Sequence, residues 1–142
     1  MAKNGIRPSK LDGVPDIRTL ELKSRHIRFS FKHLDVRSAV FGVGHRDSEY
    51  FCCLFERLKE LSRFSADEIR ANRSKSLRCH PITWADTSQI NGFTHLNSQL
   101  KGVEAFQIQI EKSIYGRIHG LFLDDVFFVV WLDCDHKLYP QK

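Results

Sequence analysis

The sequence predicts an α+β fold, in which a helical hairpin packs on one face of a small, mostly antiparallel sheet. Two observations lead to this prediction. Residues 48–73 place apolar side chains at helical spacing behind two helix-start signals, whereas residues 105–133 alternate between apolar and polar or are apolar throughout. The length of 142 residues fits one domain, expected over residues 25–142 after a flexible basic arm over residues 1–24.

The first expected strand covers residues 26–33. Ile27, Phe29 and Phe31 fall on one face of this segment, and polar side chains alternate with them, which is typical of a half-buried strand. The arm before it contains glycine and proline among its basic residues and keeps no period. Residues 35–46 contain two glycines and are expected to form a loop.

Two helices are expected next. Asp47 or Ser48 can cap a helix that runs to Ser62, and its continuous apolar stripe indicates packing on a flat surface. Ser65 followed by Glu68 is a capping box, which predicts a second short helix over about residues 66–73. Residues 74–97 are rich in Ser, Thr and Asn and are expected to be irregular.

Three strands are expected to complete the sheet. In residues 105–112, Phe106, Ile108 and Ile110 are predicted to point inward, and the intervening polar side chains, Gln107, Gln109 and Glu111, outward. Residues 117–123 and 126–133 are separated by two aspartates and are expected to form an antiparallel hairpin. The last strand is apolar at almost every position, as in a central strand buried on both faces. Trp84 and Trp131 are assigned to the core, although an exposed Trp84 could stack on RNA.

Charge and composition narrow the function. The net charge is +5, and residues 1–46 hold ten Lys or Arg against four Asp or Glu. A second basic cluster follows, made of Arg70, Arg73, Lys75 and Arg78. Such clusters suit a polyanion such as nucleic acid, suit an acidic protein equally well, or are simply solvated surface.

Several classes of protein are disfavoured. The longest apolar run, residues 126–132, is too short to span a bilayer, and the N-terminal segment has no apolar secretory core. The four cysteines show no disulfide pattern, so we expect reduced thiols and a cytoplasmic location. No phosphate loop, dinucleotide fingerprint or nucleophile elbow is present in the sequence.

The expected order β-α-α-β-β-β resembles that of the RelE/ParE toxin superfamily, and most closely that of the YoeB- and RelE-like mRNA interferases. Three details carry the resemblance. First, the strand at residues 106–112 leads through a short turn to a strand that opens with Tyr115-Gly116-Arg117. Second, the two-acid turn Asp124-Asp125 leads to an apolar strand. Third, a His and a Tyr follow that strand in the segment Asp-His-Lys-Leu-Tyr, residues 135–139.

The resemblance implies a toxin of a type II toxin–antitoxin system. Its activity would be ribosome-associated cleavage of mRNA through the RNA 2′-OH, with no metal or cofactor, and a cognate antitoxin would hold it inactive. The chemistry needs a base, cations to stabilise the phosphate, and an acid for the leaving oxygen. On this basis His136 is the candidate acid or base, Tyr139 stacks or assists proton transfer, and Arg117 clamps phosphate.

Further candidates follow from their positions. His119 lies two residues beyond Arg117 and so shares its face of a strand, and Glu111 could act as a general base. Five more residues are candidate RNA ligands: Lys112, Arg78, His80, Lys75 and Arg73. Each candidate also has a structural interpretation: Arg117 and Glu111 could form only a cross-strand ion pair, and the histidines could be ordinary loop, core or surface residues.

Three rival interpretations remain. A zinc site could use Cys79-His80, His95 and Cys134-x-His136, but that spacing is not the spacing of zinc ribbons or fingers, so no metal is predicted. Cys134 could be a nucleophile beside His136, and Asp133 with Asp135 fits strand-end and turn chemistry better than metal binding. The strongest alternative is a non-catalytic nucleic-acid- or protein-binding module of the same fold, which would depend on total positive charge and on salt.

Overall fold

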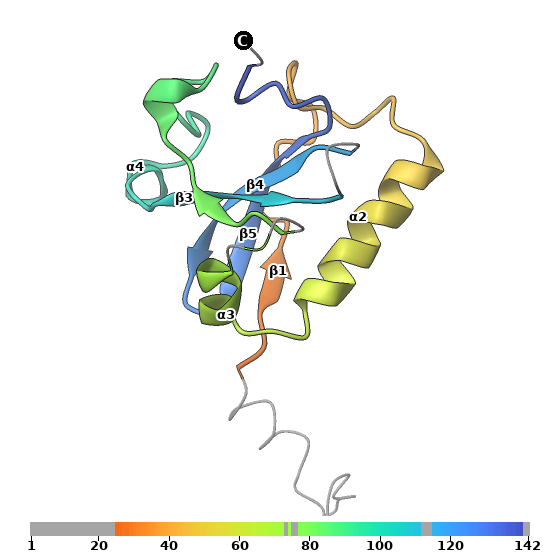
Figure 1. Ribbon diagram of the computed structural model, residues 1–142. Coiled ribbons are helices and arrows are strands. Elements are labelled where there is room, and N and C mark those ends of the chain that lie inside the picture. Colours follow the sequence, from red (N-terminus) through yellow and green to blue (C-terminus); the bar gives the residue numbers. More distant parts are fainter. Residues whose placement is uncertain (1–24, 73, 75–76, 112–114, 141–142) are drawn as a thin grey trace, which may run out of the picture.

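The computed structural model describes residues 25–72, 74, 77–111 and 115–140, and the expected arm over residues 1–24 lies outside them. The described chain is α+β, with a five-stranded mixed sheet in the order β1-β5-β4-β3-β2 (Figure 1). The strands are β1 (Arg28–Ser30), β2 (His80–Pro81), β3 (Ala105–Gln109), β4 (Arg117–Leu123) and β5 (Val126–Asp133). β1 runs parallel to β5, and the other neighbouring strands are antiparallel.

Both predicted helix starts are confirmed. Helix α2 (Ser48–Leu61) begins after Asp47, whose carboxylate accepts a hydrogen bond from the backbone N–H of Tyr50 at 3.0 Å. Helix α3 (Ala66–Ala71) begins with the full capping box: the backbone N–H of Glu68 donates to Ser65 Oγ at 3.1 Å, and the backbone N–H of Ser65 donates to Glu68 Oε1 at 2.9 Å. These bonds satisfy backbone donors that a helix start would otherwise leave unpaired.

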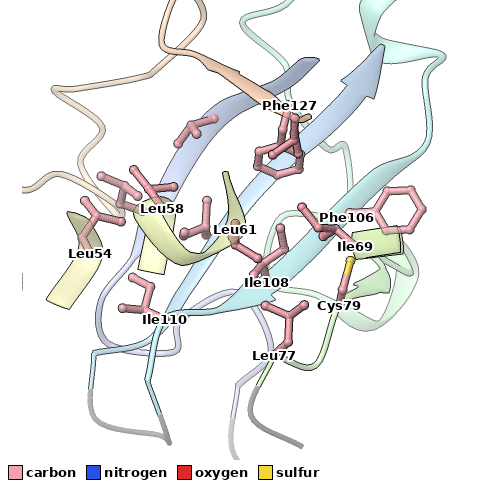
Figure 2. Packing of buried hydrophobic residues seen from close by; sticks show 14 of the residues in the cluster. Leu54, Leu58, Leu61, Ile69, Leu77, Cys79, Phe106, Ile108, Ile110 and Phe127 are labelled. Carbon is pink, nitrogen blue, oxygen red and sulfur yellow. The ribbon is translucent and has the colours of Figure 1, made fainter. Parts of the chain in front are cut away.

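The two helices cover one face of the sheet. Figure 2 shows side chains of α2 directed at the strands. The buried cluster contains Leu54, Leu58 and Leu61 from α2, Ile69 from α3, Ile108 from β3, Ile110 just after β3, and Phe127 from β5. Full burial of one such side chain contributes about 1.5–3 kcal/mol. The apolar stripe of α2 is thus the main link between the helical hairpin and the sheet.

The opposite face of the sheet is also covered, by the irregular segment between β2 and β3 and by the residues after β5. This segment contains the short 3-10 helix η1 (Trp84–Asp86) and helix α4 (Ser98–Lys101), which lies across the sheet from α2 (Figure 1). Its cluster is built around Trp131, whose ring stacks on Phe41 at 4.5 Å and meets Phe93 edge-on at 4.9 Å. Trp131 is therefore a core residue, as predicted.

This second layer overturns two predictions. Gln107 and Gln109 were expected to point to solvent, but they are only 6% and 3% exposed, because the irregular segment covers the face that they occupy. Phe31 was expected to point inward, but the first strand ends at Ser30 and Phe31 is 47% exposed. The irregular segment has no apolar period, so its packing on the sheet could not be read from the sequence.

The β4–β5 hairpin is confirmed, and β5 is an interior strand of the sheet, between β1 and β4. The pairing of the two strands shifts register between His119 and Gly120. A Cβ at Gly120 would lie 2.0 Å from the backbone oxygen of Phe128, so the strands can approach here only because glycine has no side chain.

Within the described part of the chain, no helix is long and apolar enough to cross a membrane.

Candidate functional site

A cleft of about 330 Å³ opens where β2, β3 and β4 meet the segment that follows β5. Its lining brings together residues that are far apart in the sequence: His80, Pro81, Thr83, Gln107, Arg117, Asp133, His136 and Tyr139. Four of these eight, His80, Arg117, His136 and Tyr139, are residues that the sequence had marked as catalytic or RNA-binding candidates.

Asp133 folds the segment after β5 over the cleft. Its carboxylate is buried and accepts two backbone hydrogen bonds, from Lys137 at 2.7 Å and from Leu138 at 2.8 Å. Inside the turn that these bonds close, the backbone of His136 adopts the left-handed conformation, with φ of 57°. The expected turn role of Asp133 is thus present, and it is what directs His136 toward the cleft.

Asp135 lies on the outer side of the same turn. It forms an ion pair with Arg46, and this hydrogen bond holds the pKa of the Asp135 carboxyl below its usual value. Asp135 is not among the residues that line the cleft. The pair therefore anchors the turn to the loop before α2.

Tyr139 is fixed at the rim by two contacts. Its hydroxyl oxygen accepts a hydrogen bond from the backbone N–H of Thr83 at 2.8 Å. Its ring meets the ring of His80 at a centroid distance of 6.2 Å and an interplanar angle of 63°. Tyr139 is therefore half-buried and oriented, rather than a surface residue of a loose tail.

Arg117 enters the cleft from the first position of β4. Burial lowers the pKa of its guanidinium, and the nearby Arg78 lowers it further, while Asp133 acts in the opposite direction. Arg78 does not line the cleft, but its charge adds to the positive field around Arg117, and a guanidinium with that field suits a phosphate. Arg78 itself is exposed, with φ of 46°.

Gly116 makes this placement of Arg117 possible. Its φ is 77°, and a Cβ there would lie 1.8 Å from the backbone oxygen of Asp133. Only glycine allows β4 to begin this close to the end of β5.

His119 does not reach the cleft surface, contrary to the catalytic role expected for it. The side chain is completely buried, and its Nε2 donates a hydrogen bond to Gln107 Oε1 at 3.0 Å. Burial lowers the pKa of His119 to about 3, with further contributions from Arg117 and His80, so the ring is neutral near pH 7. Asp133 Oδ2 lies 3.9 Å from the same nitrogen, which is too far for a hydrogen bond.

Glu111 lies outside the cleft lining as well. It lines a different surface hollow beside α2, together with Cys53 and Arg57. A hydrogen bond to Glu111, with burial and other effects of the carboxylates, raises the pKa of the Cys53 thiol to about 12. Glu111 is therefore not placed to act as a base for a phosphate at Arg117. Of the other predicted RNA ligands, Lys112, Arg73 and Lys75 lie outside the described residues.

Gln107 is the cleft residue that the sequence did not reveal. In the sheet it pairs with His119 on one side and with His80 on the other. The register of the two-residue strand β2 decides this position, and β2 contains Pro81, which gives no strand signal. The alternation of β3 had placed Gln107 on the solvent face.

The described cysteines and acidic residues do not meet the requirements of a metal site. In residues 25–72, 74, 77–111 and 115–140, no three His, Cys, Asp or Glu side chains come together in a way that could hold a metal ion. Cys79 and Cys134 belong to the buried cluster beneath α2 and α3, and burial raises the pKa of the Cys134 thiol.

Comparison of the chain with models of known protein families, with curated proteins and with solved structures finds no match.

Proposed function

We propose that this protein is a metal-independent endoribonuclease that uses the 2′-OH of its RNA substrate. The observation that carries the proposal is the convergence of Arg117, His136, His80 and Tyr139 in one cleft, from β4, β2 and the segment after β5. A guanidinium can stabilise the charge on the phosphate, and an imidazole can transfer the protons that cleavage of an RNA phosphodiester requires.

The proposed reaction is an internal transesterification. The 2′-oxygen attacks phosphorus, the bond from phosphorus to the 5′-oxygen breaks, and the product carries a 2′,3′-cyclic phosphate. Arg117 binds the phosphate oxygens through its planar fork of N–H donors. His136 transfers a proton, either from the 2′-OH or to the leaving 5′-oxygen, and the ring of Tyr139 supports a neighbouring base.

The finer assignment is to an mRNA interferase of the RelE type, with mRNA as its substrate and the ribosome and an antitoxin as its partners. The order of one strand, two helices and then three longer strands supports it, with the short β2, η1 and α4 added between α3 and β3. The sheet edge at β1, where Arg28 is exposed, would be the place for an acidic antitoxin segment.

The alternative is a binding module without catalysis. One observation favours it: neither His119 nor Glu111 reaches the cleft, so fewer proton-transfer groups are present than the sequence had suggested. On this alternative, RNA binding would fall steeply with salt and no phosphodiester bond would break.

The test measures cleavage by the purified protein of an RNA that contains one scissile position, and of the same RNA with 2′-deoxyribose there. We expect cleavage in the presence of a chelator, a cyclic phosphate product, and no cleavage of the deoxy substrate. His136→Ala and Arg117→Ala should lower the rate by about 100-fold or more. His45→Ala, an exposed histidine outside the cleft lining, is the matched control.

Because the proposed substrate is mRNA on the ribosome, the same variants should also be induced in growing bacteria, with mapping of transcript ends. Growth arrest with new ends in translated mRNA, lost in His136→Ala, would support the interferase assignment. Absence of cleavage both in cells and with purified, folded protein would contradict the proposal and favour the binding module.

A further inference from the structure

Three polar side chains form a continuous chain of hydrogen bonds from the core to the cleft. His119 Nε2 lies 3.0 Å from Gln107 Oε1, and Gln107 Nε2 lies 3.1 Å from His80 Nε2. The other ring nitrogen of His80, Nδ1, lies 2.9 Å from the backbone oxygen of Pro81. The chain therefore crosses three adjacent strands, β4, β3 and β2, on one face of the sheet.

The Pro81 oxygen fixes the direction of every bond in this chain. A carbonyl oxygen only accepts, so His80 Nδ1 must carry a hydrogen. In a neutral His80 the lone pair is then on Nε2, which must accept from the amide nitrogen of Gln107. The amide oxygen of Gln107 consequently faces His119, whose Nε2 must donate to it. One backbone acceptor thus sets the tautomers of two histidines and the orientation of an amide.

Protonation of His80 conflicts with this arrangement. A charged imidazole carries hydrogens on both nitrogens, so its Nε2–H would point at the Gln107 NH₂ group, donor against donor. The conflict disappears if the Gln107 side-chain amide rotates by a half-turn, because its oxygen then accepts from His80. Its NH₂ group would in turn face His119 Nε2, which must become an acceptor.

His119 is able to make that change without gaining charge. It is completely buried, and its lowered pKa keeps it neutral, but neutral imidazole exists in two tautomers. Its other nitrogen, Nδ1, has no hydrogen-bond partner among the described residues. The rings of Phe41 and Trp131 stand nearly perpendicular to the imidazole, at 87° and 82°, and an aromatic face is a weak acceptor for an N–H group.

We propose that Gln107 is an amide switch: it turns over when His80 takes up a proton, and His119 changes from the Nε2–H to the Nδ1–H tautomer in response. His119 releases the Nε2 proton to solvent and takes one up at Nδ1 during transient opening of the structure around it. Only one proton is gained, at His80, and the number on His119 does not change. The cleft alternates between a neutral and a cationic His80 while every bond of the chain is kept. Gln107 is a positioning residue in this device, and the device does not require that the cleft cleaves RNA.

The surroundings of His80 determine when the switch operates. The cleft groups that share its lining are Arg117 from β4, Asp133 at the end of β5, and His136 and Tyr139 from the following segment. An anion held by Arg117 would bring negative charge into the cleft, so we expect phosphate there to favour the cationic His80 and the turned-over state.

Nitrogen-15 NMR of the protein labelled at its histidines tests the switch directly, because protonated and unprotonated ring nitrogens have well-separated shifts. The spectrum would be followed from about pH 8 to pH 5, with and without inorganic phosphate. We expect His119 to change from the Nε2–H to the Nδ1–H tautomer with the same midpoint as the protonation of His80, and phosphate to move both midpoints upward together. Protonation of His80 with no change at His119, a charged His119, or a His80 that stays neutral while the protein is folded would each overturn the proposal.

A matched pair of variants isolates Gln107. In Gln107→Leu the two histidines lose their connection, so His119 should keep one tautomer over the whole pH range. Gln109→Leu removes another buried amide from the same face of β3, two residues away and outside the chain, and the coupled change should persist in it. A coupled change that survives in Gln107→Leu would also overturn the proposal. RNA cleavage, measured separately, reports on the enzyme assignment, and its absence would leave the tautomer result unaffected.

Discussion

The carboxylate of Asp133 accepts a hydrogen bond from the backbone N–H of Leu138 at 2.8 Å, and this contact turns the chain back over the sheet directly after its last strand. The side chain of Leu138 is then fully buried in the second hydrophobic cluster. The position of His136 and Tyr139 in the cleft depends on this one buried carboxylate.

Replacement of Asp133 by Asn should destabilise the fold by about 1–3 kcal/mol, because each carboxylate oxygen accepts one backbone hydrogen bond and an amide offers only one oxygen. The NH₂ group of the new amide would face one of the two backbone N–H groups, so that two donors would oppose each other. Denaturant unfolding measures the effect. Asp135→Asn is the control: it loses an exposed ion pair with Arg46 and should cost less than about 1 kcal/mol. Equal losses in the two variants would contradict the role given to Asp133.

Because His119 is buried and uncharged, we expect the folded protein to lose stability in acid. Its pKa is about 3 in the folded protein, against 6.5 for an ordinary histidine, so the unfolded chain binds the additional proton between these values. The stabilisation is complete above about pH 6.5 and is lost as the pH falls toward 3. The slope for one such group is about 1.4 kcal/mol per pH unit.

The measurement is the denaturant midpoint of the wild type and of His119→Gln at several pH values. The variant should be less stable than the wild type at pH 7, but its stability should fall less steeply between about pH 6 and 4. His95→Gln, which replaces an exposed histidine, should keep the wild-type slope. Parallel curves for wild type and His119→Gln would show that His119 is not the group responsible.

Gly120→Ala should prevent β4 and β5 from pairing normally. A Cβ at this position would overlap the backbone oxygen of Phe128 at 2.0 Å and the ring of Phe127 at 2.7 Å, and the backbone atom cannot move aside like a flexible side chain. We expect a loss of about 3 kcal/mol or more, seen by circular dichroism and thermal unfolding. Gly44→Ala has no atom within 4 Å of the new carbon and should change stability by less than about 1 kcal/mol.

Arg78→Ala should weaken RNA binding to a similar degree for all sequences and reduce the slope of log affinity against log salt by about 1. The reason is that the exposed Arg78 lowers the pKa of Arg117, so its charge acts on the part of the cleft where we expect the phosphate to bind. Binding to a short labelled RNA at several salt concentrations measures the slope. Arg63→Ala removes an exposed arginine beside α2 and should leave the salt slope unchanged. The same decrease of the slope in both variants would indicate an effect of overall charge rather than a phosphate site.

The elements with local signals were predictable from the sequence. The capping box at Ser65 and the Asp47 cap depend on spacings of three residues, and the β4–β5 hairpin depends on a short turn between two apolar runs. The face that Gln107 occupies was not predictable, because it depends on the irregular chain between β2 and β3. That chain buries the face with side chains that show no periodicity, such as Phe93 and Leu96.

The candidate site was predictable in its residue types more than in its geometry. The sequence predicts site residues around the last strands, and three of them, Arg117, His136 and Tyr139, line one cleft. The two-residue period of β4 also made His119 a candidate, because it shares a face of the strand with Arg117. The period shows which face a side chain occupies, but not whether other segments bury that face. His80 and Gln107 depend on the pairing of β2 with β3, a non-local contact that no pattern in the sequence specifies.

The parallel pairing of β1 with β5 has a consequence for synthesis. Arg28 emerges from the ribosome long before Val126, the residue it pairs with, so the edge of the sheet and the layer under α2 cannot close until most of the chain has been made. Contacts between such distant segments slow folding, because a long loop must be closed before the contact forms. The cleft, which is built partly from residues after β5, is assembled in the same late step, so nascent chains should have no complete site.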